Sequence, residues 1–201
     1  MPATPPRSKR YIDAEEHLLA SFRLARLIYE SGFRPTFIVG LWRGGSTVGI
    51  AVQECLEYLG VSTDHIAIRT SYAGLASYRE HDTAEQPIRI HGTQYLLEHL
   101  SAEDRLLLVD DVYSTGRSVA AVVARLEQRL RKNLPGDIRT AAVWYRDAAP
   151  DRRPPDFFLE QTRDWLVLPY ELTGVDEIEL RLKKPKLAPL LDRIRSATKT
   201  R

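Results

Sequence analysis

The amino-acid sequence predicts an α/β fold in which helices flank a mostly parallel sheet. Apolar runs at residues 37–41 and 106–109 each lead through a short polar turn into a segment with helical periodicity. Such continuous apolar runs are typical of strands that are buried on both faces of a parallel sheet. A third run at 140–145 follows the second of these helical segments, and 201 residues suit one α/β domain with a sizeable core.

The composition is that of an ordinary soluble protein. Hydrophobic residues make up 43% of the chain, charged residues make up 28%, and the formal net charge is +2, which gives no argument for a nucleic-acid partner. The single cysteine, Cys55, cannot form an internal disulfide and suits a reducing compartment. Apolar runs stay well below 18 residues and we identify no signal peptide, so we expect a cytoplasmic protein without a membrane partner.

The amino-terminal part predicts an arm, a short strand and a helix. Residues 1–10 are basic and rich in proline, which is typical of a flexible arm. Residues 11–12 are expected to form a short edge strand. A helix is then expected between a cap at Asp13 and Gly32, because apolar residues recur there at helical spacing: Leu18, Phe22, Ala25 and Tyr29.

The buried strand at 37–41 leads into the turn Trp42-Arg43-Gly44-Gly45-Ser46. Two glycines allow the backbone to approach a ligand closely, and Arg43 supplies a fixed positive charge. The alternative is that Gly-Gly only makes a tight turn. The helix that follows has its expected buried face at Val48, Val52, Cys55 and Leu59.

The next stretch predicts a third strand at 64–70 and then a long loop at 71–86. A loop of this length inside a compact domain is typical of an active-site lid, and a plain surface hairpin is the alternative. Residues 87–90 are expected to form a short strand and residues 94–100 a short helix. The five histidines show no metal-ligand spacing, so we interpret them as solvated or structural.

The most informative stretch is residues 106–118, where a buried strand runs into Asp110 and Asp111. Ligands of open α/β sheets bind beyond the carboxyl ends of the strands. The following Thr115-Gly116-Arg117-Ser118 places backbone N–H groups and two hydroxyls at a helix N-terminus, which favours an anion. Carboxylates beside an anion site suit a ribose 5-phosphate. The alternative is a plain turn in which Thr115 caps the helix and the aspartates are solvated.

The rest of the chain predicts further elements of the same fold. A long helix is expected up to the break at Pro135-Gly136, followed by a central strand at 139–145 that ends at Arg146. Residues 156–159 are expected to form an edge strand. A last helix is expected within 183–201, where it could pack on the domain or mediate oligomerisation.

Residues 106–118 closely resemble the phosphoribosyl pyrophosphate (PRPP) motif of type I phosphoribosyltransferases. The resemblance implies a Rossmann-like domain over residues 11–182 with a small hood at about 155–171. It implies that Asp110 and Asp111 act in catalysis by holding the ribose hydroxyls, directly or through Mg²⁺. It also implies that the 5′-phosphate is bound by Ser114, Thr115, Gly116, Arg117 and Ser118.

Two further stretches are similar to the purine-specific members of that family. Arg43, Gly44 and Gly45 resemble their pyrophosphate loop, which often contains a non-proline cis peptide, and the matching bond is Trp42–Arg43. Ser71 and Tyr72 resemble the start of their mobile loop, which would cover residues 71–86 and exclude water from the reacting centre.

The expected base site combines residues 146, 165 and 166. Arg146 stands near the place of a lysine that contacts the exocyclic O6 in the xanthine and hypoxanthine-guanine enzymes; the alternative is a rim arginine paired with Asp147 or Asp151. Trp165 and Leu166 resemble the hood of the bacterial xanthine-guanine type, which implies that Trp165 stacks on the purine while Leu166 offers backbone groups. The alternative is that Trp165 is a core residue.

The resemblance implies a glycosyltransferase of the pentosyltransferase type that acts in purine salvage. PRPP and a 6-oxopurine (xanthine, hypoxanthine or guanine) would give a nucleoside 5′-monophosphate and pyrophosphate, with Mg²⁺ as cofactor, and we expect a homo-oligomer, a dimer or tetramer. One departure is Ser114, which stands where these enzymes usually have an acid acting at N7. The alternatives are a PRPP- or nucleotide-sensing regulator without turnover and an unrelated nucleotide-binding α/β protein.

Overall fold

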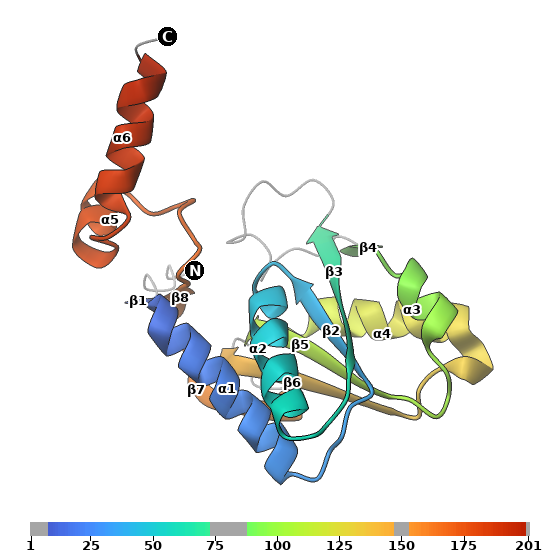
Figure 1. Cartoon of the computed structure of the whole chain (residues 1–201). Helices are drawn as coiled ribbons and strands as arrows, with labels where there is room; N and C mark the ends of the chain where they lie inside the picture. Colours follow the sequence, from blue (N-terminus) through green and yellow to red (C-terminus); the bar gives the residue numbers. More distant parts are fainter. Residues whose placement is uncertain (1–7, 73–87, 147–152, 200–201) are drawn as a thin grey trace, which may run out of the picture. The chain divides into compact units, whose positions relative to one another are not determined.

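The computed structural model describes residues 8–72, 88–146 and 153–199. The chain divides into two compact units, Glu15–Arg163 and Met1–Ala14 with Asp164–Arg201. We call them the sheet unit and the terminal unit; Figure 1 shows their elements. None of the helices in the described ranges is long and apolar enough to cross a membrane.

The sheet unit is built on a six-stranded sheet in the order β4-β3-β2-β5-β6-β7. All neighbouring strands are parallel except the β3–β4 pair. This arrangement confirms the α/β prediction and the short strand after the long loop. The strands are β2 (Phe37–Trp42), β3 (Asp64–Tyr72), β4 (Ile88–His91), β5 (Arg105–Tyr113), β6 (Asp137–Arg146) and β7 (Phe157–Thr162).

Helices cover both faces of this sheet (Figure 1). On one face, a hydrophobic cluster joins α3 and α4 to alternate strand residues such as Val39 and Leu108. The intervening residues Ile38, Leu107 and Val109 are also buried, on the opposite face, where α2 packs against β2 and β5. The helices are α1 (Ala14–Glu30), α2 (Gly44–Tyr58), α3 (Gln94–His99) and α4 (Arg117–Leu130), which continues into a 3₁₀ turn at Arg131–Asn133.

Helix α1 is buried along a different face from the one that its apolar spacing indicates. Leu18 and Phe22 are exposed, by 49% and 37%. The buried residues are mostly smaller or polar: His17, Ala20, Ser21, Leu24, Ala25 and Ile28. The polar members are accommodated by specific contacts, because the Ser21 hydroxyl donates to the His17 carbonyl and the His17 ring lies 5.9 Å from that of Trp144.

The terminal unit pairs the two ends of the chain. Strand β1 (Lys9–Tyr11) lies parallel to β8 (Trp165–Val167), and helices α5 (Glu177–Lys183) and α6 (Ala188–Lys199) follow. Asp176 and Glu179 form a capping box that begins α5. Lys9 Nζ lies 2.5 Å from the Glu179 carboxylate, and this interaction is the largest cause that lowers the pKa of Glu179 to about 2.

The observed elements correct three boundaries expected from the sequence. Residues 9 and 10 belong to β1 instead of the flexible arm, while residues 1–7 lie outside the described ranges. The segment expected as a hood at 155–171 is divided between the two units, because β7 is an edge strand of the six-stranded sheet and the terminal unit starts at Asp164. The helix expected over 183–201 corresponds to α6, which begins only at Ala188, and a further helix that the sequence did not indicate, α5, precedes it.

Candidate active site

Two carboxylates mark the carboxyl end of β5, which lies between β2 and β6 in the middle of the sheet. The Asp111 amide donates to Asp110 Oδ1 at 3.0 Å, and the Val112 amide donates to Asp111 Oδ1 at 2.7 Å. Burial and the neighbouring Asp111 charge raise the pKa of Asp110 well above its usual range. The pair therefore shares a confined site in which a ligand hydroxyl or a cation would relieve the repulsion.

These carboxylates fit a magnesium ion. Mg²⁺ usually binds through one or two carboxylates, several waters and the phosphates of its substrate. Asp110 and Asp111 supply that number of protein ligands. Burial and the neighbouring Asp111 charge raise the pKa of Asp110, and a cation would offset both effects. Within the described ranges, no group of three or more histidine, cysteine, aspartate or glutamate side chains could hold a metal ion.

The turn after β5 leads into α4 at Gly116. Gly116 is the N-cap of α4 and has a φ of 67°. This φ favours glycine, and a Cβ atom at this position would also lie 2.2 Å from the hydroxyl oxygen of the Tyr113 side chain. Because the first N–H groups of α4 have no partners within the helix, they can bind an anion. Thr115 is therefore not the N-cap that the alternative interpretation expects.

The loop after β2 brings a second helix N-terminus to the carboxylates. The Trp42–Arg43 peptide bond is cis, as the resemblance implied, and α2 begins at Gly44. A Cβ atom at Gly45 would lie 2.2 Å from the Val109 carbonyl oxygen and 3.0 Å from Asp110 Cα. Gly45 therefore permits the contact that places this loop beside the Asp110–Asp111 pair.

Arg146 is held by Ser114, a contact that the sequence interpretation missed. Arg146 is 7% exposed at the end of β6. Its Nη2 and Nε lie 3.0 and 3.3 Å from the Ser114 hydroxyl oxygen. The register of β5 and β6 explains the contact. Tyr113 is paired with Tyr145, so the residues that follow them, Ser114 and Arg146, lie at the same edge of the sheet. The alternative partners Asp147 and Asp151 lie outside the described residues.

His17 is a second residue near the site that the sequence did not reveal. It is 7% exposed, and burial lowers its pKa while the charge of Asp111 acts in the opposite direction. Helix α1 thus places a buried imidazole within the electrostatic influence of Asp111. No motif pointed to it, because its position depends on how α1 packs over the sheet.

The remaining predicted residues lie on other elements. Ser71 and Tyr72 end β3 and pair with β4, while the loop at 73–87 lies outside the described residues. Trp165 and Leu166 belong to β8 of the terminal unit and pair with Lys9 and Arg10. Trp165 is half-buried, which differs from the fully buried core residue of the alternative interpretation, whereas Leu166 is buried.

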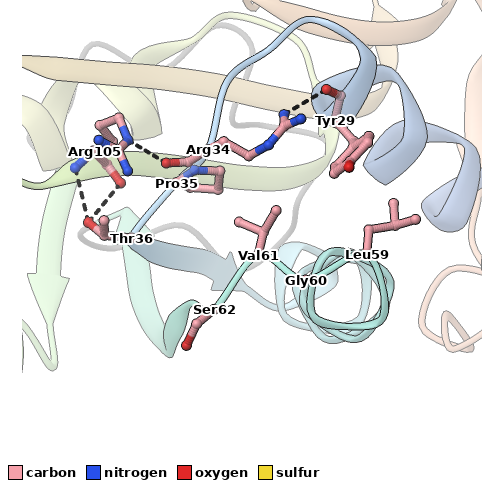
Figure 2. A pocket seen from close by; sticks show the side chains of 9 residues that line it. All are labelled: Tyr29, Arg34, Pro35, Thr36, Leu59, Gly60, Val61, Ser62 and Arg105. Atoms are coloured by element: carbon pink, nitrogen blue, oxygen red, sulfur yellow. Dashed lines mark hydrogen bonds between the residues drawn. The ribbon is translucent and has the colours of Figure 1, made fainter.

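A separate cavity of about 350 Å³ lies at the amino ends of β2, β3 and β5, at the sheet edge away from the carboxylates (Figure 2). Arg34 is one of the charged residues that line it. Its guanidinium lies 3.9 Å from the centre of the Tyr29 ring and donates to the Tyr29 carbonyl at 2.7 Å. Because Arg34 caps the carboxyl end of α1, its charge has a structural function there.

Comparison with known proteins identifies the architecture. The model of the phosphoribosyl transferase domain matches residues 9–170 of the chain. A search of curated proteins finds no match.

Three solved structures share the fold at low sequence identity. A purine phosphoribosyltransferase from Pyrococcus horikoshii is 22% identical, with a TM-score of 0.61, and the match covers 84% of this chain and 98% of that one. A hypothetical protein from Neisseria gonorrhoeae with bound ppGpp is 16% identical, with a TM-score of 0.66 and coverage of 91% and 99%. The xanthine-guanine-hypoxanthine phosphoribosyltransferase of Helicobacter pylori is 17% identical, with a TM-score of 0.60 and coverage of 89% and 98%.

Proposed function

The chain belongs to the phosphoribosyl transferase domain family, and on that premise we propose that it transfers the 5-phosphoribosyl group of PRPP to a purine base, a 6-oxopurine. One observation carries the proposal: the Asp110–Asp111 pair lies near the N-termini of two helices. Gly45, in the first turn of α2, packs against Asp110, and the chain after Asp111 runs through a short turn to Gly116, where α4 begins. Two anion sites on either side of a carboxylate pair suit a molecule with phosphates at both ends of a ribose.

In the proposed reaction, each part of the site holds one part of PRPP. The turn from Ser114 to Ser118 binds the 5′-phosphate, and Arg43, Gly44 and Gly45 bind the pyrophosphate. Asp110 and Asp111 hold the ribose 2′- and 3′-hydroxyls. A magnesium ion bound by these carboxylates would neutralise charge on the pyrophosphate. The bond from C1′ to the pyrophosphate oxygen breaks and releases pyrophosphate. A bond from C1′ to a base nitrogen forms, and that nitrogen gives up its proton to water before or during the transfer.

The carboxylates also supply the electrostatic part of catalysis. Positive charge develops on the ribosyl centre as the pyrophosphate leaves, and fixed negative groups stabilise it. The two aspartates are held by backbone amides of residues 111 and 112, so little reorganisation is needed. Positioning of base and ribose by separate parts of the chain contributes the rest.

Trp165 tests the proposed base site. Replacing Trp165 with alanine should raise the KM for the base by about fivefold or more, because base–aromatic stacking contributes about 1–3 kcal/mol per base. The KM for PRPP should stay within about twofold, which steady-state assays with each substrate varied will show. Trp42 is 52% exposed, but it adjoins the pyrophosphate loop. Trp42→Ala therefore serves as a contrast that should affect PRPP more than the base. Equal changes in both constants, or unfolding, for Trp165→Ala would contradict the stacking proposal.

Ser114 makes the base's own ionisation important. A hydroxyl that accepts hydrogen bonds from Arg146 cannot take a proton from the base as a carboxylate does at neutral pH. We therefore expect a preference for xanthine, the most acidic of the three bases, and a hypoxanthine rate that rises with pH as this base ionises. Rates measured from pH 6 to 9 for each base test the expectation; rapid hypoxanthine turnover with a flat profile would refute it.

A regulatory protein that binds PRPP or a nucleotide without turnover is the second candidate. The Neisseria gonorrhoeae structure with bound ppGpp shows this fold holding a guanosine nucleotide, and Ser114 departs from the pattern of the 6-oxopurine enzymes. This candidate predicts that the protein binds PRPP or nucleotides but releases no pyrophosphate with any base.

A substrate panel separates the two candidates. The full chain is incubated with PRPP, Mg²⁺ and one base at a time, including xanthine, hypoxanthine, guanine, adenine and the pyrimidine bases, and pyrophosphate release is measured. Release with an oxopurine supports the proposed transfer. Pyrophosphate release only with another base would mean that this base is the substrate. Binding of PRPP or a nucleotide, measured by calorimetry, without pyrophosphate release favours the regulator.

A further inference from the structure

Lys184 is a buried lysine in the terminal unit that the proposed reaction does not use. It follows α5 and is 9% exposed. Its Nζ donates to two consecutive carbonyl oxygens, at 2.7 Å to Leu168 and at 3.0 Å to Pro169. Burial lowers its pKa, and the charge of Glu171 acts in the opposite direction. An ammonium group is costly to bury, so these two hydrogen bonds define its place.

The backbone of Lys184 is fixed at the junction of the two carboxy-terminal helices. Its amide donates to the Leu180 carbonyl at 2.9 Å, and its carbonyl accepts from the Leu187 and Ala188 amides at 3.0 and 3.3 Å. The end of α5 and the start of α6 therefore hold the lysine in one position. The side chain extends from this anchor to the turn after β8.

The turn that receives Lys184 follows directly on the proposed base-binding strand. Glu171 closes it twice, because its amide donates to the Leu168 carbonyl at 3.0 Å and its carboxylate accepts from the Leu168 amide at 3.4 Å. Pro169 restricts the backbone further. Lys184 adds the connection to the helices, so the backbone after Trp165 and Leu166 is restrained from both sides.

We propose that Lys184 is a positioning residue for base binding, because it clamps the Leu168–Glu171 turn and thereby fixes the backbone of the strand that carries Trp165 and Leu166. The inference rests on the proposed function, in which this strand contacts the purine. A space-filling apolar side chain could occupy the same volume. Two aimed hydrogen bonds to adjacent carbonyls instead specify the orientation of one short segment.

The test compares Lys184→Met with two matched variants of the full chain. Methionine keeps the length but removes the donors, Lys184→Arg keeps charge and donors, and Lys186→Met changes an exposed lysine two residues away. We expect Lys184→Met to raise the KM for the base by about tenfold, the factor for loss of about 1.4 kcal/mol of hydrogen bonding to a charged group. The KM for PRPP should stay within about twofold. Lys184→Arg should keep the KM for the base close to that of the unmodified protein, and Lys186→Met should change neither constant.

A second readout separates this inference from the proposed reaction. Calorimetry measures binding of a purine nucleoside 5′-monophosphate and of PRPP to the same proteins. If the unmodified protein releases no pyrophosphate but Lys184→Met weakens nucleotide binding selectively, the proposed transfer is wrong and the positioning inference stands. If Lys184→Met lost affinity equally for both ligands, or lost none, the positioning inference would be overturned. The proposed transfer would still stand if the unmodified protein released pyrophosphate. If Lys184→Met shows no cooperative thermal transition, Lys184→Gln replaces it under the same criteria.

Discussion

Replacing Asp111 with asparagine is expected to lower turnover by at least about a hundredfold, the scale seen when one preorganised electrostatic contact to a developing charge is lost. Asparagine keeps the shape and an oxygen that can accept from the Val112 amide, which lies 2.7 Å from Asp111 Oδ1. The fold should therefore survive. What is lost is the negative charge beside the proposed ribosyl centre. Pyrophosphate release and thermal denaturation, measured on the same preparations, check both halves of this expectation.

Two comparisons make the Asp111 result specific. Asp110→Asn should have a similar or somewhat smaller effect, because asparagine keeps an oxygen that can accept from the Asp111 amide, 3.0 Å from Asp110 Oδ1, and loses only the charge. Asp137→Asn is the control and should leave turnover unchanged. Asp137 begins β6, at the opposite end of the strand from the site, and its Oδ1 lies 2.9 Å from Arg139 Nε. Near-normal PRPP-dependent activity in both site variants would contradict the ribose assignment.

The central strands and the PRPP motif could be predicted because their signals are local. A strand buried on both faces is a continuous apolar run, so β2 and β5 are visible without knowledge of their neighbours. The glycines in the loops after β2 and β5 also follow from backbone requirements. Gly116 has a φ of 67°, and a Cβ atom at Gly45 would meet the backbone of β5.

The features that escaped prediction depend on contacts between distant parts of the chain. Strand β1 pairs with β8 although Lys9 and Trp165 are far apart in sequence, and neither segment signals the pairing by itself. On α1 the hydrophobic positions at 18 and 22 remain exposed while a histidine and a serine are buried. Hydrophobic spacing cannot anticipate this, because a buried polar side chain needs partners, and those partners come from other parts of the fold.

Replacing Gly45 with alanine is expected to destabilise the protein by about 1–3 kcal/mol, the usual cost of forcing an extra atom into a packed site. The sign is informative. Within a helix, alanine is ordinarily more favourable than glycine by about 1 kcal/mol, and Gly45 lies in the first turn of α2. Here the new Cβ atom would lie 2.2 Å from the Val109 carbonyl oxygen and 3.0 Å from Asp110 Cα. Both are backbone atoms, so α2 and β5 must move apart.

That displacement would separate the proposed pyrophosphate loop from the carboxylate pair, so we expect the KM for PRPP to rise more than the KM for the base. Urea denaturation measures the stability change, and steady-state kinetics measure the two constants. Gly136→Ala is the matched control, because a Cβ atom there would meet nothing within 4 Å. If Gly45→Ala were as stable and as active as Gly136→Ala, the close approach of α2 to β5 would not be a requirement of the site, and the pyrophosphate assignment of Arg43, Gly44 and Gly45 would lose its structural basis.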